Sequence, residues 1–250
     1  MCTVLFMPKD NSICFASLRD ENPLRPKAIE PRKDISATIQ FLAPRDSLAG
    51  GTWMGVNEFN NVIILLNGGF ENHTKKNNYI KSRGLIVIDL LKTELPVIDW
   101  NLMDMTDIEP FTLVVWSDNN LFQLVWDGQQ KNKSLLDATI PHIWSSSTLY
   151  SQSAKEYRKQ LFENWVALNP VISQTNVLTF FKSYMDNDNG FIMERSKTLK
   201  TLSYSFLEVQ NNEQANFAYH DFLSFQNTYT TIEVKSTFTS LTINNSTTQY

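Results

Sequence analysis

The chain has 250 residues, of which 42% are hydrophobic and 19% charged, and its formal net charge at pH 7 is −4. These values are typical of a folded soluble protein, and we expect a single domain over residues 1–250. An acidic chain without a basic stripe gives no support for binding to nucleic acid or to an anionic membrane surface.

Strand pairs joined by short turns are predicted in the first half of the chain. The expected hairpins are Cys2–Met7 with Ile13–Leu18, Thr52–Asn57 with Val62–Leu66, and Phe111–Trp116 with Leu121–Trp126. The clearest turn signal is Ser117-Asp118-Asn119-Asn120, between the last two strands. Later strands are expected at Ser203–Val209, Ala215–Tyr219 and Thr228–Val234, and residues 236–250 are either a strand or a loose tail.

Helices are predicted between these groups of strands. Residues Ser82–Leu91 favour a helix, although Leu85-Ile86-Val87-Ile88 also suits a strand. A second short helix is expected at Val177–Tyr184. Hairpins without regular strand–helix–strand alternation favour an α+β fold of antiparallel sheets whose outer faces are covered by helices.

A longer helix is predicted from Ser153, because Ser153 and Glu156 have the spacing of a capping box. Within this helix, four apolar residues recur at helical period and are expected in the core. They are Tyr157, Leu161, Trp165 and Leu168.

Metal and membrane sites are not expected. The chain has 2 cysteines and 3 histidines, and none of them has metal-ligand spacing. We therefore expect no metal and no cofactor. The start of the chain lacks a basic leader, and apolar runs such as 62–66 are far shorter than a membrane span. A cytoplasmic protein without an integral membrane segment is the expectation.

Cys2 follows the initiator methionine, and a small side chain at this position favours removal of Met1. The product would begin with a residue that carries both a thiol and a free α-amine, with ordinary pKa values of about 8.5 and about 7.7–8.0. Such a residue can supply the nucleophile and the general base for attack on an acyl carbon. The alternative is that Cys2 is a small apolar residue at the start of a strand.

A charged cluster and a glycine-rich cluster accompany Cys2. Arg19-Asp20-Glu21 ends the strand expected beside the Cys2 strand, so Asp20 would hold the amine while Arg19 binds a substrate carboxylate or fixes Asp20. The alternative is a charged turn. Gly50-Gly51-Thr52-Trp53 permits close backbone approach and a pocket wall, or is a turn before a strand with a core tryptophan.

Asn67 follows a buried strand and precedes two glycines. Its side-chain amide is a candidate oxyanion donor, and one such donor is worth roughly 2.7–4 kcal/mol in acyl-transfer chemistry. Asn-Gly is also a turn signal by itself, so a simple turn is the alternative.

Together these clusters resemble the NRDE family, the transport and Golgi organisation protein 2-like proteins. The resemblance is dense over residues 1–90 and faint beyond them. It rests on Met1-Cys2, Arg19-Asp20-Glu21 with Arg25-Pro26, Arg45-Asp46, Gly50–Val56 and Ser82-Arg83-Gly84. The family is similar to the N-terminal nucleophile hydrolases, which implies a four-layer αββα sandwich of two antiparallel sheets flanked by helices.

The same resemblance implies roles for individual residues. Cys2 would be the nucleophile and its amine the base, and Asp20 would hold the amine. Arg19 would support the site, Asn67 would line the oxyanion hole, and Gly51–Trp53 would shape the mouth of the pocket.

The sequence also departs from the family pattern. Leu18 stands where the family motif has Asn, and Ser146 of Trp144-Ser145-Ser146 would offer a hydroxyl where a Leu-Ser-Asn element offers an amide. Thr201-Leu202-Ser203 replaces a Thr-Arg-Ser-like element and leaves Lys200 as the nearest cation. An ammonium does not reproduce a planar guanidinium, so these departures imply an altered substrate or lost catalysis.

Two functions therefore stay open. One is an N-terminal-cysteine amidohydrolase that acts on a C–N amide or other acyl bond of a small molecule after removal of Met1. The other is a non-catalytic binding or trafficking protein that handles lipid, acyl-CoA or haem in Golgi or secretory organisation. Haem binding has little support, because the chain has neither CxxCH nor a Cys-Pro pair.

Overall fold

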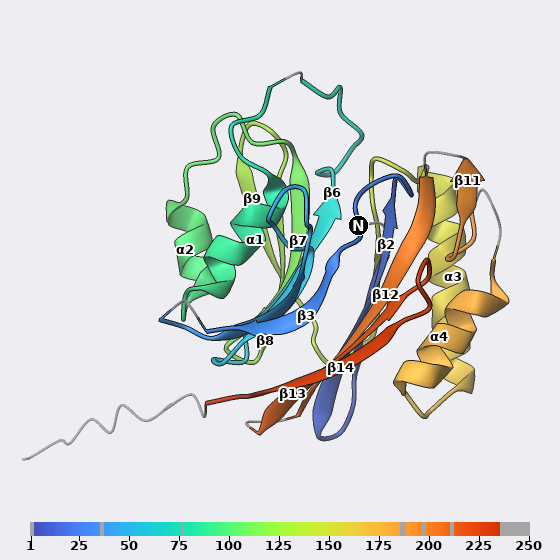
Figure 1. Ribbon diagram of the computed structural model, residues 1–250. Helices are drawn as coiled ribbons and strands as arrows, with labels where there is room; N and C mark the ends of the chain where they lie inside the picture. Colours follow the sequence, from blue (N-terminus) through green and yellow to red (C-terminus); the bar gives the residue numbers. More distant parts are fainter. Residues whose placement is uncertain are drawn as a thin grey trace, which may run out of the picture.

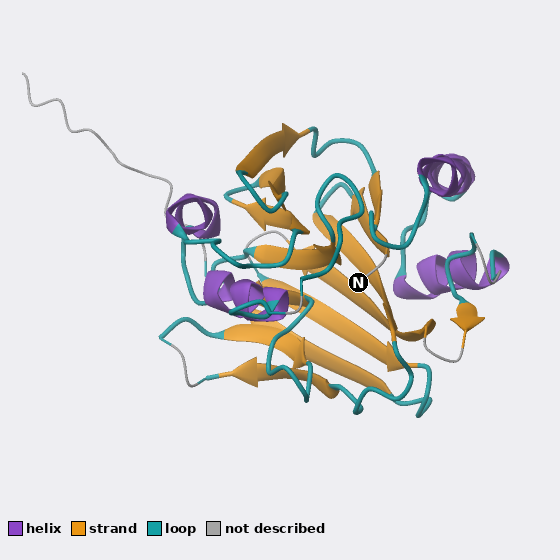
Figure 2. Cartoon of the chain, turned by 90° about the horizontal axis from the view of Figure 1, so that it is seen from above, coloured by secondary structure: helices purple, strands orange, loops and turns teal. Residues whose placement is uncertain are grey.

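The computed structural model describes residues 3–35, 38–76, 78–185, 189–196, 199–210 and 213–235. Within these ranges the chain forms two antiparallel sheets and four helices (Figures 1 and 2). Cys2 and residues 236–250 lie outside the described residues. None of the helices in the described part combines the length and the apolar character that crossing a bilayer requires.

The first sheet joins the two ends of the chain. Its order is β10 (His142–Ser145), β1 (Thr3–Pro8), β2 (Ser12–Glu21), β12 (Leu199–Gln210), β13 (Gln214–Asp221) and β14 (Asn227–Glu233), with β11 (Glu194–Ser196) also on β12. At its centre β2 pairs with β12 from Ser12↔Gln210 to Glu21↔Lys200. The hairpins expected at both ends of the chain are therefore neighbours in one sheet.

The second sheet is a meander in chain order. Its strands are β3 (Ile29–Asp34), β4 (Phe41–Arg45), β5 (Met54–Asn57), β6 (Val62–Asn67), β7 (Phe111–Ser117), β8 (Asn120–Trp126) and β9 (Lys131–Leu136). Asp118 and Asn119 connect β7 to β8 with φ angles of 50° and 56°. Positive φ at both central residues is the geometry of a tight hairpin turn, which confirms the turn predicted there.

Alternation along each strand divides the apolar side chains between two cores. On β1, Val4 and Phe6 belong to a cluster between the two sheets, together with Val62 and Ile64 of β6. Leu5 of the same strand belongs to a different cluster, beneath the helices that follow β10. Successive residues of a strand point to opposite faces, so β1, β2, β12 and β13 each contribute to both cores.

Two helices cover each sheet (Figure 1). Side chains of α1 (Arg83–Leu91) and α2 (Pro96–Leu102) form a core with β6 and β7. Side chains of α3 (Gln152–Leu168) and α4 (Gln174–Ser183) form another with β1, β2 and β12. The segment at 82–91, for which the sequence allowed a helix or a strand, is thus helical. The helix predicted at Val177–Tyr184 is also present, as α4, and begins three residues earlier.

The beginning of α3 differs from the prediction. Ser151, not Ser153, is the N-cap, and its hydroxyl accepts a hydrogen bond from the Ala154 amide at 3.2 Å. The capping-box interpretation was therefore wrong. The helix begins directly after Ser151, two residues before the predicted N-cap, so Ser153 lies inside its first turn.

The buried face of α3 also differs from the prediction. Tyr157 is 48% exposed and Leu168 81% exposed, so their assignment to the core was wrong. The buried residues are Ala154, Arg158 and Phe162, spaced four apart along one face. An arginine occupies the middle of this face, and a pattern of apolar residues alone cannot reveal it.

The edges of the sheets are protected in different ways. β14 lies beside β3 of the other sheet, where the Thr228 hydroxyl donates a hydrogen bond to Glu30 Oε2 at 2.6 Å. At the far edge of the second sheet, Lys131 Nζ of β9 donates to the carbonyl oxygens of Trp100 and Asn101 at the end of α2, at 2.9 and 2.8 Å.

Candidate active site

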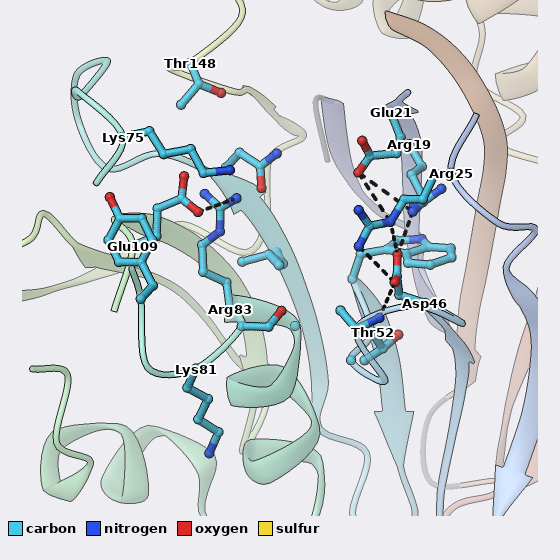
Figure 3. Close-up of a pocket in the computed structure, with 18 of the residues that line it drawn as sticks. Arg19, Glu21, Arg25, Asp46, Thr52, Lys75, Lys81, Arg83, Glu109 and Thr148 are labelled. Carbon is cyan, nitrogen blue, oxygen red and sulfur yellow. Dashed lines mark hydrogen bonds and ion pairs between the residues drawn. The ribbon is translucent and has the colours of Figure 1, made fainter. Parts of the chain in front are cut away.

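A cavity of about 700 Å³ lies where β2 and β6 end. It is lined by Arg19 and Glu21 of β2, Leu65 and Asn67 of β6, the loop between β4 and β5, and the segment that leads into α1. Figure 3 shows charged side chains on two facing walls of this cavity. Three of the predicted site segments, at Arg19, Gly51–Trp53 and Asn67, therefore meet at one place.

Asp46 organises the first wall. Its Oδ2 accepts hydrogen bonds from Arg19 Nη2 at 2.9 Å and from Arg25 Nε at 2.6 Å. Its Oδ1 accepts from the backbone amides of Leu48 and Ala49 at 3.1 and 2.7 Å. Burial opposes ionisation of this carboxyl, but the hydrogen bonds from Arg25 and Ala49 and the nearby guanidinium charges hold its pKa below the ordinary value.

Arg19 also lies over an aromatic ring. Its guanidinium carbon is 4.6 Å from the centre of the Trp53 ring, and Trp53 is only 4% exposed. The indole Nε1 of Trp53 is buried and has no hydrogen-bond partner in the described part of the chain. Trp53 is thus a wall of the cavity and holds the flat face of Arg19.

Gly51 has a packing role that the sequence suggested only in general terms. A Cβ at Gly51 would lie 2.5 Å from the carbonyl carbon of Gly84 at the start of α1. The Thr52 amide donates to the Gly84 carbonyl at 3.0 Å, and the Thr52 hydroxyl donates to the Met54 carbonyl at 3.1 Å. These two glycines let the loop touch the helix, and Thr52 is committed to holding the loop.

Glu109 organises the second wall. Arg83 Nη2 lies 3.1 Å from Glu109 Oε2, and His73 Nε2 lies 3.3 Å from Oε1. Lys81 forms an ion pair with Asp89 of α1. Lys75 lines the cavity and is exposed, and it has no ion-pair or hydrogen-bond partner in the described ranges.

Asp20 lies on the opposite face of β2 from Arg19. Its Oδ1 accepts a hydrogen bond from Thr201 Oγ1 at 2.6 Å, and Tyr150 Oη donates to Oδ2 at 3.4 Å. The side chain is 4% exposed. The carboxylate that Arg19 holds at close range is thus Asp46, and Asp20 is fixed by hydroxyl groups of β12 and of the segment after β10.

Asn67 and Ser146 come together as neighbours. Ser146 Oγ donates a hydrogen bond to the Asn67 backbone carbonyl at 2.8 Å. The side-chain amide of Asn67 makes no hydrogen bond within the described residues. Both residues line a second cavity, of about 260 Å³, and Asn67 lines the large one as well.

Sequence reasoning missed Arg158, which is fully buried behind β1. Arg158 Nη2 donates to Thr3 Oγ1, and Nε donates to Ser145 Oγ at 3.1 Å. Its guanidinium carbon lies 4.1 Å from the centre of the Tyr150 ring and 4.4 Å from that of Phe191. One side chain of α3 therefore fixes the residue after Cys2 and the tyrosine that contacts Asp20.

Lys200 is not brought to the cavity. Its ammonium lies 3.2 Å from Glu194 Oε2, and it lines neither of the two cavities. Arg195 is the nearby guanidinium. It donates to the Leu149 carbonyl at 3.0 Å and lies 5.6 Å from the centre of the Tyr150 ring. The Arg-Ser pair at 195–196 is the sequence signal that could have found this arginine.

The second cysteine is remote from this chemistry. Cys14 is fully buried, and burial, together with the Glu208 carboxylate, raises the pKa of its thiol to about 12. Within the described ranges, no three His, Cys, Asp or Glu side chains come together in a way that would hold a metal ion.

The sequence profile of the Transport and Golgi organisation 2 family matches residues 1–243. The chain belongs to this family. The match extends far beyond residues 1–90, where the motifs of the resemblance are dense. No curated protein sequence is significantly similar to the chain.

Three solved structures that are similar to the chain in fold are those of hydrolases. A variant of conjugated bile acid hydrolase from Clostridium perfringens has a TM-score of 0.61 and 10% identity over 98% of this chain and 100% of its own. A second variant, with a cysteine replaced by alanine, has a TM-score of 0.60 and 10% identity over 93% and 92%. The Caenorhabditis elegans orthologue of N-acylethanolamine-hydrolyzing acid amidase has a TM-score of 0.57 and 11% identity over 82% and 92%.

At such low identity these likenesses establish the fold alone. Two antiparallel sheets with helices, in a fold similar to that of these solved structures, are therefore shown for this member of the Transport and Golgi organisation 2 family.

Proposed function

We propose that this protein is an N-terminal-cysteine hydrolase that cleaves an amide or related acyl bond of a small molecule after Met1 is removed. One observation carries the proposal. Thr3 pairs with Leu18 on one side and with Ser145 on the other. In this register, the next ladder position on β1, which belongs to Cys2, would fall between Arg19 and Ser146.

Strand alternation supports the same placement. Val4 and Phe6 face the other sheet, and so does Arg19, which lies over Trp53 of the opposite loop. A side chain two positions before Val4 would share that face. The proposed nucleophile would then open on the large cavity, and Asn67 would be within its neighbourhood.

The proposed reaction has two steps. The Cys2 thiol gives its proton to the α-amine, and its sulfur attacks the carbonyl carbon while the Asn67 amide donates to the oxyanion. The C–N bond breaks, the amine leaves with the proton, and a thioester remains. Water then attacks the thioester carbon, with its proton passing through the α-amine to the sulfur, which releases the acid and restores the thiol.

In the proposal, three further residues support the reaction at Cys2. Asp20 holds the protonated amine from the opposite face of β2. Arg19 fixes the cavity wall through Asp46, and Ser146 positions Asn67 through its carbonyl. We further propose that the two sheets and their helices form the four-layer αββα sandwich, in one domain over residues 1–250.

The test is site-specific acylation. Protein with Met1 removed, verified by intact mass, is treated at pH 7.5 with a thiol-directed acylating reagent and mapped by peptide mass spectrometry. Cys2 should be labelled and Cys14 not, because Cys14 is buried and its pKa is about 12. Cys2→Ala should remove all labelling and all turnover, whereas Cys14→Ala should change neither.

Two results would contradict the proposal. One is retention of Met1 in protein from its native source, because the α-amine would then not belong to Cys2. The other is correctly processed protein in which Cys2 resists acylation. Binding without turnover would favour the non-catalytic alternative.

A further inference from the structure

Two cavities of different character meet at Asn67. Asn67 lines both the 700 Å³ cavity and the 260 Å³ cavity, and its carbonyl is held by Ser146 from the wall of the smaller one. We infer that the substrate is a two-part conjugate, with an apolar acyl group in the smaller cavity and an anionic group on the amine side in the larger one. This inference rests on the proposed function, since it places the reacting bond at Asn67.

The smaller cavity suits only part of a ligand. Complete ligand sites occupy about 300–1,000 Å³, so a cavity of about 260 Å³ accepts a short acyl chain or a single ring. Its lining includes the apolar residues Leu66, Val125, Ile143 and Trp144 on one side and, from α3, the polar or charged residues Gln152, Lys155, Glu156 and Lys159. Phe70 also lines it and is 56% exposed, which places an aromatic side chain where an apolar group would enter.

The larger cavity suits an anion. Five Arg and Lys side chains line it against three Asp and Glu side chains, in a protein whose net charge is −4. The three carboxylates are already engaged, Asp46 and Glu21 by Arg19 and Arg25, and Glu109 by Arg83. Among these five cations, Lys75 is the one without an ion-pair or hydrogen-bond partner in the described part of the chain, so an entering carboxylate, sulfonate or phosphate would meet an unpaired charge there.

The position of Asn67 indicates which part of the ligand occupies which cavity. An acyl carbon held at Asn67 has its chain on the side of the smaller cavity, where apolar side chains lie. The nitrogen substituent then extends past Trp53 towards the two charged walls seen in Figure 3. The leaving amine therefore carries the anionic group, and the acyl half stays on the enzyme as the thioester.

A matched pair of compounds tests the charge requirement. N-Octanoylglycine and N-octanoylglycinamide have the same acyl chain and nearly the same size, but only the first carries a carboxylate. Binding to the Cys2→Ala variant is measured by calorimetry, and turnover by the processed wild-type protein is measured as released amine. We expect N-octanoylglycine to bind about tenfold more tightly, the effect of one charge-assisted hydrogen bond.

Matched variants locate the two halves of the ligand. In the Cys2→Ala background, Lys75→Ala should reduce the charge preference to about twofold. Lys76→Ala is the control, because Lys76 is an exposed neighbour that does not line the cavity. Phe70→Ala should weaken both compounds by the same factor, whereas Phe225→Ala, at a position 79% exposed and outside both cavities, should weaken neither.

The outcomes separate this inference from the proposed function. Tenfold charge discrimination in binding without turnover would retain the ligand class and reject the hydrolase. Turnover of both compounds at equal rates, with equal affinity, would retain the hydrolase and reject the two-part ligand. Absence of binding by either compound would overturn the inference as well.

Discussion

Asp46 holds the first wall of the large cavity through a single carboxylate. Its oxygens accept hydrogen bonds from Arg19, Arg25 and two loop amides. Two guanidinium groups would repel each other without this charge between them. The loop therefore depends on the ionised state of Asp46, and so do both arginines, for which Glu21 is only a more distant second partner at 3.9 Å.

The stability of this wall is expected to depend on pH. Because the pKa of Asp46 is depressed, its contribution to the free energy of unfolding is present above the unfolded pKa of about 4 and is lost as the pH falls through the lower folded value. Asp46→Asn should therefore lower stability at pH 7 and flatten the fall between pH 5 and pH 2. Urea unfolding across this range measures both effects.

Asp10→Asn is the control for this experiment, because Asp10 is exposed in the turn between β1 and β2. Its pH profile should match that of the wild-type protein. A profile of Asp46→Asn parallel to the wild-type one would refute the role assigned to Asp46.

Several residues predicted for one site lie together, but their hydrogen-bond partners were not predicted. Arg19, Gly51–Trp53 and Asn67 were expected at one site and line one cavity. Their contacts were not predictable, because Asp46 lies 27 residues from Arg19 in the sequence and the two meet only when the sheets pack. Cys2 lies outside the described residues, so its role stays a prediction.

β1 is held more firmly than an ordinary strand. It pairs with β10 and β2, and Arg158 of α3 hydrogen-bonds to its first described residue, Thr3. The same guanidinium donates to the Asn189 and Gly190 carbonyls. A helix, two strands and a loop thus converge on one buried cation next to the proposed nucleophile.

Removal of this cation should loosen β1. Arg158→Met leaves buried hydroxyl and carbonyl groups without a donor, and each such group costs about 1–3 kcal/mol. We expect a loss of at least 2 kcal/mol in the free energy of unfolding, with faster hydrogen exchange at residues 3–8. Lys159→Met, at the exposed next position of α3, should change stability by less than about 0.5 kcal/mol. Unchanged exchange in β1 would show that Arg158 does not anchor it.

Strands with buried apolar runs and strong turns were predicted correctly, whereas the polar strands β3 and β9 were missed. Every residue of β7 is buried, and its turn into β8 has the expected residues. β3 and β9 are largely polar and exposed, because they lie at the edges of their sheet. An edge strand buries little of either face, so its sequence has no apolar alternation to detect.

At the scale of the whole molecule, the two sheets share one core. Val4 and Phe15 of the first sheet belong to the same cluster as Val62 and Val114 of the second. The pairing of β2 with β12 also joins residues that are 179 to 198 positions apart in the sequence. This long-range pairing was not predictable, because nothing local to either strand specifies its partner.

A shared core should make unfolding cooperative. We expect one transition in urea, with the same midpoint by tryptophan fluorescence and by far-ultraviolet circular dichroism. Trp53 reports on the core between the sheets and Trp100 on the core beneath α1 and α2. Midpoints that differ between the two signals would reject the proposal of a single domain over residues 1–250.

The sheet edges described above also bear on how copies of the protein meet at high concentration. A bare strand edge offers unpaired amides and carbonyls to another chain, and this is a common route to aggregation. Here β3 and β14 lie against each other, β10 has only four residues, and β9 carries Lys131 and Lys133. Among the sheet edges of the described residues, β9 is the longest without another strand beside it, and there the lysines of two copies would repel each other.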